Sequence, residues 1–403
     1  MQTVSALPLA NNCAFDYSAA VGLKGFFSFC AFALFGSAVS ARAAEPACFV
    51  YIGTYTKGSS QGIYAARFDP STGALSKPEL AAKSENPSFV AFHPSRPCLY
   101  AVGTVFQPGG KRAGIVSAFK TDAATGQLAL LNQVSSRGTG PCHLVVDATG
   151  RYVLLANYNS GSAAVIAIKE DGSLGESTGF VQHSGSGPCG RRQEEPHAHS
   201  INLSADNRFA FVADLGLDKV FIYKFDRARG TLAPNDVPFA AVPPGSGPRH
   251  FAFHPDNKRA YVINEMGSTI TAFNFDADAG ALETIETVSS LPAGFRNKNT
   301  TAEIQVHPSG KFAYGSNRGH DSIAVFSVDK STGRLALLEH ASSRGKTPRG
   351  FSLDPGGRWL IAANQDSNNI LVYEIDPATG RLSFTGQEYE VGTPVCVKFM
   401  AAK

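Results

Sequence analysis

The sequence predicts an all-β fold, a seven-bladed β-propeller, and two observations carry this prediction. A unit of roughly 50 residues repeats along the chain, and its short runs rich in Val, Ile, Phe and Tyr end at Gly, Pro, Asn or Asp, which is typical of strands joined by tight turns. The motif Gly-x-Leu recurs seven times, although only six complete units are present. The seventh unit is therefore split, as in a propeller whose terminal strands share one blade.

Each unit presents its elements in the same order. A small residue precedes a first apolar run, a turn with His-Pro or Asp follows, and a second run ends near Ala-Asn. A Ser-rich loop then leads to a third run that closes on Asp, before Thr-Gly-x-Leu begins the fourth strand. The complete copies begin at Asn86, Gly140, Pro196, Gly247, Thr301 and Thr347.

The split unit places its parts at the two ends of the mature chain. Its first run follows Gly392, and its later runs begin at Phe49 and Gly62. A stack of sandwiches is the alternative architecture, but it would not need the chain ends to complete one another. No change of composition marks a second domain, so residues 44–403 are expected to form one propeller.

Residues 1–43 resemble a secretory signal peptide. Lys24 precedes an apolar stretch, Gly25–Val39, and small residues then offer a cleavage site before Ala44. Because no basic residue precedes Lys24, we expect translation to start at Val21. The apolar stretch is too short to span a bilayer stably, so the mature protein is expected to be exported, periplasmic or secreted, without stable membrane insertion.

Composition excludes several classes of protein. In 403 residues, 43% are hydrophobic and 17% are charged, with 40 Gly and 23 Pro, which excludes disorder, collagen and coiled coil. The formal charge of +3 arises from 36 basic and 33 acidic residues without a basic run, so nucleic acid is not an expected partner. The cysteines of the mature chain show neither zinc-site nor disulfide-framework spacing. They are Cys48, Cys98, Cys142, Cys189 and Cys396.

The register of the repeat identifies the residues at one end of the channel. The first strand of a blade is innermost and the second runs back beside it, so the start of one and the end of the other lie together. Such positions differ in chemistry from blade to blade, which one asymmetric ligand would require and core packing would not. The inner-strand starts are Ser88, Cys142, His199, Arg249, Ala302 and Arg349, and the second-strand ends are Tyr158, Leu215, Glu265, Arg318 and Gln365.

Three arginines and one carboxylate converge in this set. Arg249 and Glu265 are sixteen residues apart on antiparallel strands, and taken alone they form an ion pair at a strand end. Arg318 and Arg349 come from the next two blades and leave an excess of positive charge. Guanidinium forks match carboxylate or phosphate oxygens, so the expected ligand is a small anion.

His199 is the candidate for acid–base chemistry, because an imidazole beside a carboxylate can move a proton near neutral pH. His197 lies two residues before it, and two imidazoles would need a third ligand to hold a metal. Glu265 is the carboxylate expected at the same level of the channel, but it has arginine partners, so no metal is expected. We expect His197, His320, Arg349 and Gln365 to bind the substrate. The histidines at the opposite end of the channel are interpreted as turn structure: His93, His254 and His307.

The chain resembles the seven-bladed propeller lactonase family, which includes cycloisomerase-type 6-phosphogluconolactonases and carboxymuconate lactonising enzymes. The resemblance covers nearly the whole mature chain and implies a site made of His199, Arg249, Glu265 and Arg318 without metal or organic cofactor. Its motifs are YIGTYT at Tyr51, PHAHS at Pro196, GPRHFAFHP at Gly247, SNRGHDSI at Ser316, TPRGF at Thr347 and GTP at Gly392.

The resemblance implies hydrolysis of a lactone ester in an acidic small molecule, as in a 6-phosphogluconolactonase. Arg318 and Arg349 would hold the acidic group, and Arg249 would stabilise the oxyanion. Glu265 with His199 would activate water and protonate the leaving alkoxide. Two alternatives stay open: a cycloisomerase that opens or closes a muconolactone, and a non-catalytic exported propeller that binds an anion or a protein.

Overall fold

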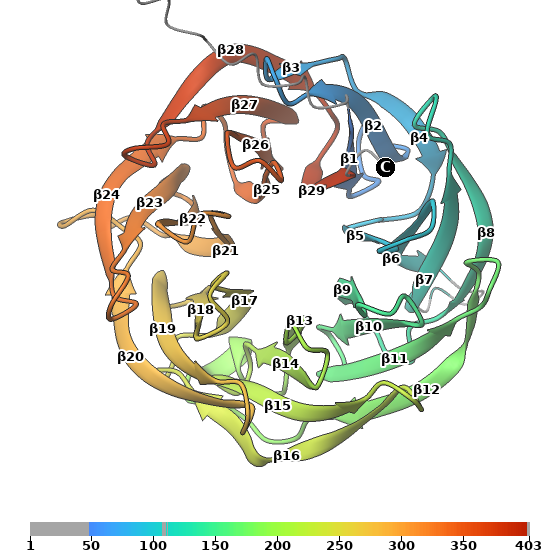
Figure 1. Ribbon diagram of the computed structural model, residues 1–403, viewed down its shortest axis with the longest axis horizontal. Helices are drawn as coiled ribbons and strands as arrows, with labels where there is room; N and C mark the ends of the chain where they lie inside the picture. The colour runs from blue at the N-terminus through green and yellow to red at the C-terminus, as the bar shows by residue number, and fades with distance from the viewer. Residues whose placement is uncertain (1–47, 107–109, 111, 401–403) are drawn as a thin grey trace, which may run out of the picture. The chain divides into compact units, whose positions relative to one another are not determined.

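Seven antiparallel sheets stand as blades around a central channel (Figure 1). The computed structural model describes residues 48–106, 110 and 112–400, and these seven sheets are counted over that part of the chain. The predicted all-β, seven-bladed propeller is confirmed. The predicted signal peptide, residues 1–43 with a start at Val21, lies outside the described residues.

The two inner strands of every blade run antiparallel to each other. The innermost strands are β29 (Pro394–Met400), β5 (Phe89–Phe92), β9 (Pro141–Val146), β13 (Ala198–Leu203), β17 (Pro248–Phe253), β21 (Thr300–Val306) and β25 (Pro348–Leu353). The second strands are β1 (Cys48–Thr54), β6 (Cys98–Phe106), β10 (Tyr152–Asn157), β14 (Phe209–Asp214), β18 (Arg259–Asn264), β22 (Phe312–Arg318) and β26 (Trp359–Asn364).

Two further strands complete each blade toward the perimeter. The third strands are β2 (Gly62–Asp69), β7 (Arg112–Thr121), β11 (Ser162–Ile168), β15 (Lys219–Asp226), β19 (Thr269–Asp276), β23 (Ser322–Val328) and β27 (Asn369–Ile375). The outermost strands are β3 (Ala74–Leu75) with β4 (Glu79–Lys83), β8 (Leu128–Ser135), β12 (Leu174–Gln182), β16 (Thr231–Ala241), β20 (Ala281–Ser289), β24 (Leu335–Ser342) and β28 (Leu382–Glu390).

The ring closes through the two ends of the chain. Strand β29 pairs antiparallel with β1, with Val50 opposite Phe399 and Ile52 opposite Val397. Strand β29 also contacts β25 and β5, the inner strands of the neighbouring blades. The terminal strands therefore share one blade, as the split repeat predicts.

Burial explains the run of apolar residues in the second strands. Both faces of a second strand are covered by adjacent blades, so β10, β14 and β26 are buried at every position, and no polar face is needed. The outermost strands instead have one solvent face, and β12 alternates between partly buried and exposed residues after its first position.

In several blades, a tyrosine of the second strand donates a hydrogen bond to the next blade. The hydroxyl of Tyr100 donates to the Gly172 carbonyl at 2.9 Å, and Tyr261 donates to Gly333 at 2.9 Å. The accepting glycine is the one in the Gly-x-Leu motif, and at Gly333 its φ of 75° is a conformation that favours glycine. The recurring motif is thus a contact between blades as well as a turn.

The turn histidines fasten the blades at the other end of the channel. His307 Nε2–H donates to the Gly357 carbonyl of the next blade at 2.6 Å, and its Nδ1 accepts from the Ser309 amide at 3.0 Å. His93 and His254 make the equivalent contacts with Gly150 and Gly310. These contacts agree with the interpretation of these histidines as turn structure.

We expect His307→Ala to destabilise the fold by about 1–3 kcal/mol, because it leaves a buried carbonyl without its donor. Urea unfolding measures this loss, and the exposed residue Lys330 provides a control, since Lys330→Ala should change the free energy of unfolding by less than about 0.5 kcal/mol. Equal stability of the two variants would contradict the structural role of His307.

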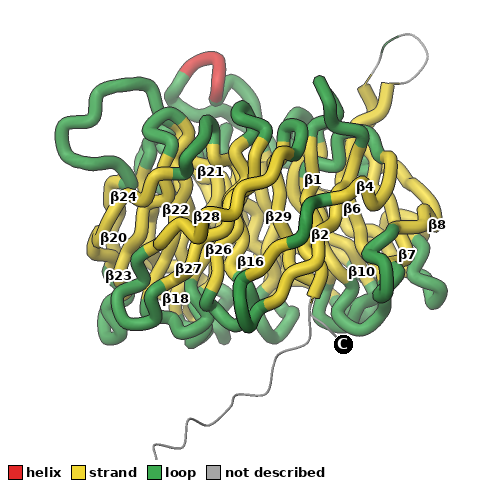
Figure 2. Tube along the Cα trace, turned by 90° about the horizontal axis from the view of Figure 1, so that it is seen from above, coloured by secondary structure: helices red, strands yellow, loops and turns green. Residues whose placement is uncertain are grey.

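One 3-10 helix, η1 (Gly190–Arg192), occurs in the described ranges and rises above the strands on one face of the ring (Figure 2). Within those same ranges no helix is long and apolar enough to cross a membrane. Cys142, Cys189 and Cys396 are free thiols.

Candidate functional site

Four β-bulges aim side chains of the inner strands into one end of the channel. In β13, Ala198 pairs with Asp214 and Ser200 with Ala213, so His199 is the extra residue of a bulge. The same irregularity in β9, β17 and β25 leaves Cys142, Arg249 and Arg349 as the extra residues. A bulge re-aims the side chain that it carries, which brings the four register positions to a common centre.

The ends of the second strands supply the facing residues. Arg318 is the last residue of β22, and Tyr158 and Glu265 follow β10 and β18 by one residue. The antiparallel register places each end beside the bulge of its own or a neighbouring blade. The predicted meeting of two layers at this end of the channel is therefore observed.

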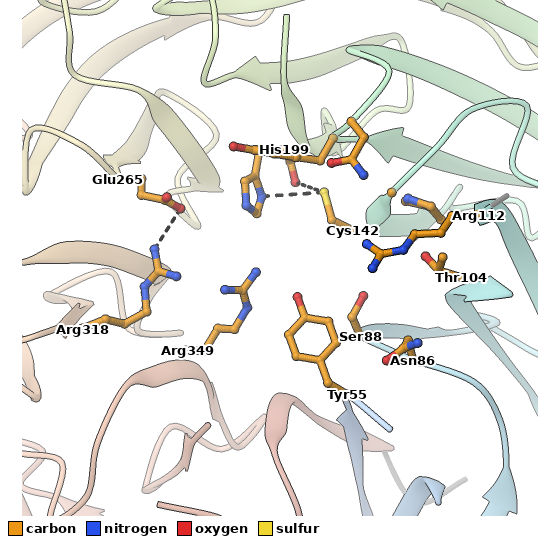
Figure 3. A pocket seen from close by; sticks show the side chains of 14 residues that line it. Tyr55, Asn86, Ser88, Thr104, Arg112, Cys142, His199, Glu265, Arg318 and Arg349 are labelled. Atoms are coloured by element: carbon orange, nitrogen blue, oxygen red, sulfur yellow. Dashed lines mark hydrogen bonds and ion pairs between the residues drawn. The ribbon is translucent and has the colours of Figure 1, made fainter. Parts of the chain in front are cut away.

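All of these residues except Arg249 line a polar cavity of about 360 Å³. Figure 3 shows Glu265, Arg318 and Arg349 on one side, His199 and Cys142 on a second, and Tyr55, Ser88 and Arg112 on the remaining sides. The full lining is Tyr55, Asn86, Ser88, Thr104, Arg112, Gly140, Pro141, Cys142, Tyr158, Asn159, His199, Glu265, Arg318 and Arg349.

Glu265 is held by three guanidinium groups. Its Oε2 lies 3.0 Å from Arg249 Nε and 2.8 Å from Arg318 Nη2. Its Oε1 lies 2.6 Å from Arg192 Nη2. Although burial raises the pKa of Glu265, the charges of Arg318 and Arg249 dominate and lower it to about 2. The carboxylate therefore stays ionised and is a weak base.

Two of the paired arginines are also fixed by main-chain carbonyls. Arg249 Nη1 donates to Ala302 O at 2.6 Å, and Arg318 Nη2 donates to Thr301 O at 2.6 Å. Burial, Arg349 and Arg318 together lower the pKa of Arg249 to about 9, which leaves it charged at neutral pH. Glu265 thus neutralises part of a buried cluster of like charges.

His199 is a buried, neutral imidazole. Burial, followed by the charge of Arg249, lowers its pKa well below the ordinary value of 6.5. Its Nδ1 lies 3.8 Å from Cys142 Sγ, and that thiol donates to the His199 carbonyl at 3.2 Å. Burial raises the pKa of Cys142 to about 12, so the residue remains a thiol and is not a nucleophile at neutral pH.

Arg349 differs from Arg249 and Arg318 in its contacts. Within the described part of the chain its guanidinium has no hydrogen bond or ion pair, and it lies over the ring of Tyr55 at 5.4 Å. Figure 3 shows it directed into the cavity. On another side of the cavity, exposed Arg112 lies over the ring of Phe106 at 5.5 Å. Both cations have donors available for a ligand.

Further buried rings pack beside His199, and the ring of His250 lies 5.4 Å from the His199 ring. His250 Nδ1–H donates to Glu303 Oε1 at 3.0 Å, and burial lowers the pKa of His250 to about 4 despite that carboxylate. The rings of His250 and Phe89 meet at 5.8 Å although their strands are not neighbours, and His143 contacts both rings. These rings therefore cross the channel.

Three of the residues expected to bind substrate do not line the cavity. His197 stacks on Tyr158 at 4.4 Å, and its Nδ1–H donates to the Tyr158 carbonyl at 3.0 Å. Gln365 Nε2 donates to Asp366, and Gln365 lines a separate surface hollow. His320 Nδ1 contacts Ser322 Oγ at 2.8 Å. Of the predicted site, His199, Glu265, Arg318 and Arg349 meet in the cavity, with Arg249 bound to Glu265.

Arg192 was missed by the repeat register because it lies in the loop between β12 and β13. Its neighbour Gln193 is fully buried and donates through Nε2 to Leu215 O and to Asp218 Oδ1. The signal available in the sequence was the basic pair Arg191 and Arg192 directly before the PHAHS segment. Among the described residues no group of three or more His, Cys, Asp or Glu is arranged to hold a metal ion.

The cavity at this end of the propeller channel is polar and lined by three arginines, a composition that is suited to a small anionic ligand. The comparison with known families is more specific. Residues 49–399 match the family described as "Lactonase, 7-bladed beta-propeller", and the chain belongs to this family.

Relatives named as lactonases share most of their length with this chain. The 6-phosphogluconolactonase of Bacillus subtilis is 40% identical over 350 residues, which cover 87% of this chain and 97% of the relative. The 6-phosphogluconolactonase of Formosa agariphila is 34% identical over 311 residues, covering 76% and 86%. The periplasmic gluconolactonase of Pseudomonas aeruginosa superposes with a TM-score of 0.83 at 34% identity, covering 89% of this chain and 100% of that structure.

Proposed function

We propose that this protein hydrolyses the lactone ring of a small acidic sugar lactone, of the 6-phosphogluconolactone type. Membership of the lactonase family and the names of the relatives support this activity. The observation that carries it is that two groups line one cavity: the neutral imidazole of His199 and the guanidinium of Arg349, which has no hydrogen bond or ion pair among the described residues.

Arg349 is the residue best placed to stabilise the oxyanion. The resemblance to the lactonase family implied Arg249 for this role, but the Nε and Nη1 donors of Arg249 are bonded to Glu265 and Ala302. A donor that is already paired gains less from a developing negative charge than one that is not. Arg112, on another side of the cavity, is available for the acidic group of the substrate.

His199 is the proposed general base. Its imidazole takes a proton from water as the water oxygen attacks the lactone carbonyl carbon. The tetrahedral oxyanion is stabilised by Arg349, the bond between the carbonyl carbon and the ring oxygen breaks, and the ring oxygen takes a proton. The product is a hydroxy acid, which releases one proton to the medium. Glu265 holds Arg249 and Arg318 in place beside this chemistry.

Export of the chain stays a prediction. A periplasmic gluconolactonase is among the solved relatives, and a substrate met outside the cytoplasm would be consistent with residues 1–43 acting as a signal peptide. Whether the substrate is a phosphorylated or an unphosphorylated lactone depends on the compartment of the protein, and assays with glucono-lactone and its 6-phosphate distinguish the two substrates.

Acid release measured by pH-stat tests the proposed function. Glucono-lactone, its 6-phosphate and a muconolactone are each incubated with the wild type and with Arg349→Gln. We expect acid release well above the spontaneous rate from at least one sugar lactone, and a 10²–10³-fold lower kcat in the variant.

The proposal fails if the wild type releases acid from neither sugar lactone. Thermal stabilisation by the anionic compounds without acid release from any of the three would then indicate a binding protein. Acid release from the muconolactone alone, with the unsaturated dicarboxylate as product, would indicate a cycloisomerase, because eliminative ring opening frees a second carboxylic acid without adding water.

A further inference from the structure

Tyr55 lines the cavity but has no role in the mechanism proposed so far. It follows β1, and its main-chain amide donates to the Thr393 carbonyl at 3.1 Å. That bond links the two ends of the chain in the shared blade and fixes the start of the loop. Figure 3 shows the Tyr55 hydroxyl directed toward the centre of the cavity. The hydroxyl has no hydrogen-bond partner among the described residues.

The opening of a lactone leaves an alkoxide, which needs a proton donor. Few groups in the cavity are suited to this. The Cys142 thiol donates to the His199 carbonyl, and burial raises its pKa to about 12. The alcohols of Ser88 and Thr104 are weaker acids than a phenol. Tyr158 carries the other phenol, but burial raises its pKa, and its oxygen already accepts from Arg192 Nη2 at 3.4 Å.

Arg349 and Tyr55 border the same part of the cavity. The Arg349 guanidinium lies over the Tyr55 ring at 5.4 Å, and both residues line the cavity. Arg349 is also the proposed oxyanion partner. Because the carbonyl oxygen and the ring oxygen of a lactone are bonded to the same carbon, a substrate whose carbonyl oxygen faces Arg349 would place its ring oxygen near the Tyr55 hydroxyl.

We propose that Tyr55 is a further catalytic residue, the general acid that protonates the ring oxygen as the lactone opens. This inference rests on the proposed function. Water attacks from above the plane of the ester, whereas the leaving oxygen lies in that plane, so the base and the acid belong on different walls of the cavity. Figure 3 shows His199 and Tyr55 on opposite walls.

The step balances in protons. His199 gains a proton from the attacking water, and Tyr55 gives one to the ring oxygen as the carbon–oxygen bond breaks. The resulting phenolate and imidazolium return to their neutral forms by net transfer of that proton through solvent. The acid product ionises and accounts for the proton that appears in the medium.

The test compares Tyr55→Phe with Tyr64→Phe, a control in the same blade whose hydroxyl accepts from the Gln61 amide outside the cavity. We expect Tyr55→Phe to lower kcat on the best sugar lactone by about 10²–10³-fold. Its affinity for the open-chain acid product, measured by calorimetry, should stay within threefold of the wild-type value. Tyr64→Phe should change neither quantity by more than threefold.

Each outcome decides the assignment. Turnover of Tyr55→Phe within threefold of the wild type overturns the role of Tyr55 but leaves the proposed function intact. Parallel losses of turnover and product affinity make Tyr55 a binding residue and also overturn it. Absence of lactone hydrolysis by the wild type removes the proposed function and, with it, the role of Tyr55.

Discussion

Replacing Glu265 by glutamine is expected to lower the free energy of unfolding by about 3–5 kcal/mol and to abolish most turnover. Glutamine has the same shape but no charge. Arg249 and Arg318, with side chains only 3% and 10% exposed, would then be buried cations without an anion. Their positions, and with them the shape of the cavity, depend on the carboxylate between them.

An added anion should restore part of the lost stability of Glu265→Gln. Bound sulfate or phosphate can replace the negative charge that the carboxylate provided. Either salt should therefore raise the melting temperature of the variant more than that of the wild type. Differential scanning calorimetry with and without the anion measures the difference. A matched control is Glu339→Gln, because Glu339 pairs at 3.1 Å with an arginine, Arg381, that is half exposed. Such a pair contributes at most about 1 kcal/mol.

The acid sensitivity of the fold should change in the same variant. Because the pKa of Glu265 is lowered to about 2 in the folded protein, its contribution to stability is complete above the unfolded value of about 4.3. This contribution is lost as pH falls from that value through about 2. Wild type and Glu265→Gln should therefore converge in stability over this range. An unchanged difference between pH 7 and pH 2 would show that Glu265 does not act through its charge.

The repeat predicts much of this site because equivalent positions of the repeat occupy equivalent places in each blade. Once the unit is aligned, the position at the start of each inner strand is fixed. In four blades the residue at that position is the one that the structure places in a bulge: Cys142, His199, Arg249 and Arg349. The end of the second strand is fixed in the same way, which yields Glu265 and Arg318. Blade number and closure follow from counting Gly-x-Leu and noting the split unit.

Residues outside the regular strands were harder to predict for a physical reason. Gln365 holds a register position, but its amide turns to Asp366, since a neighbouring carboxylate offers a closer partner than the cavity. His197 is only two residues from His199, yet it stacks on Tyr158. Arg192 contacts Glu265 and Tyr55 lines the cavity, and both residues lie in segments between the strands. The repeat does not predict where such a segment directs its side chains.

Replacing His199 by glutamine is expected to lower kcat by about 10²–10⁴-fold, the contribution of a positioned general base. Substrate affinity should change little, because the hydrogen-bond donors proposed to bind the substrate are those of Arg349 and Arg112. His254→Gln is the control, since His254 lies in a turn at the opposite end of the channel and bonds the Gly310 carbonyl. Steady-state rates for the three proteins, each shown to be folded by circular dichroism, provide the comparison.

The pH dependence of kcat distinguishes a base from a packing residue. Burial and the charge of Arg249 keep His199 neutral at pH 7 by lowering its pKa well below 6.5. The wild-type rate should therefore be flat from about pH 6.5 to 8 and should fall only in more acidic solution, as the imidazole becomes protonated. His199→Gln should lose this acid limb together with most of its rate, because glutamine does not titrate. If the variant keeps the same acid limb at a lower rate, another group is the base and His199 only shapes the cavity.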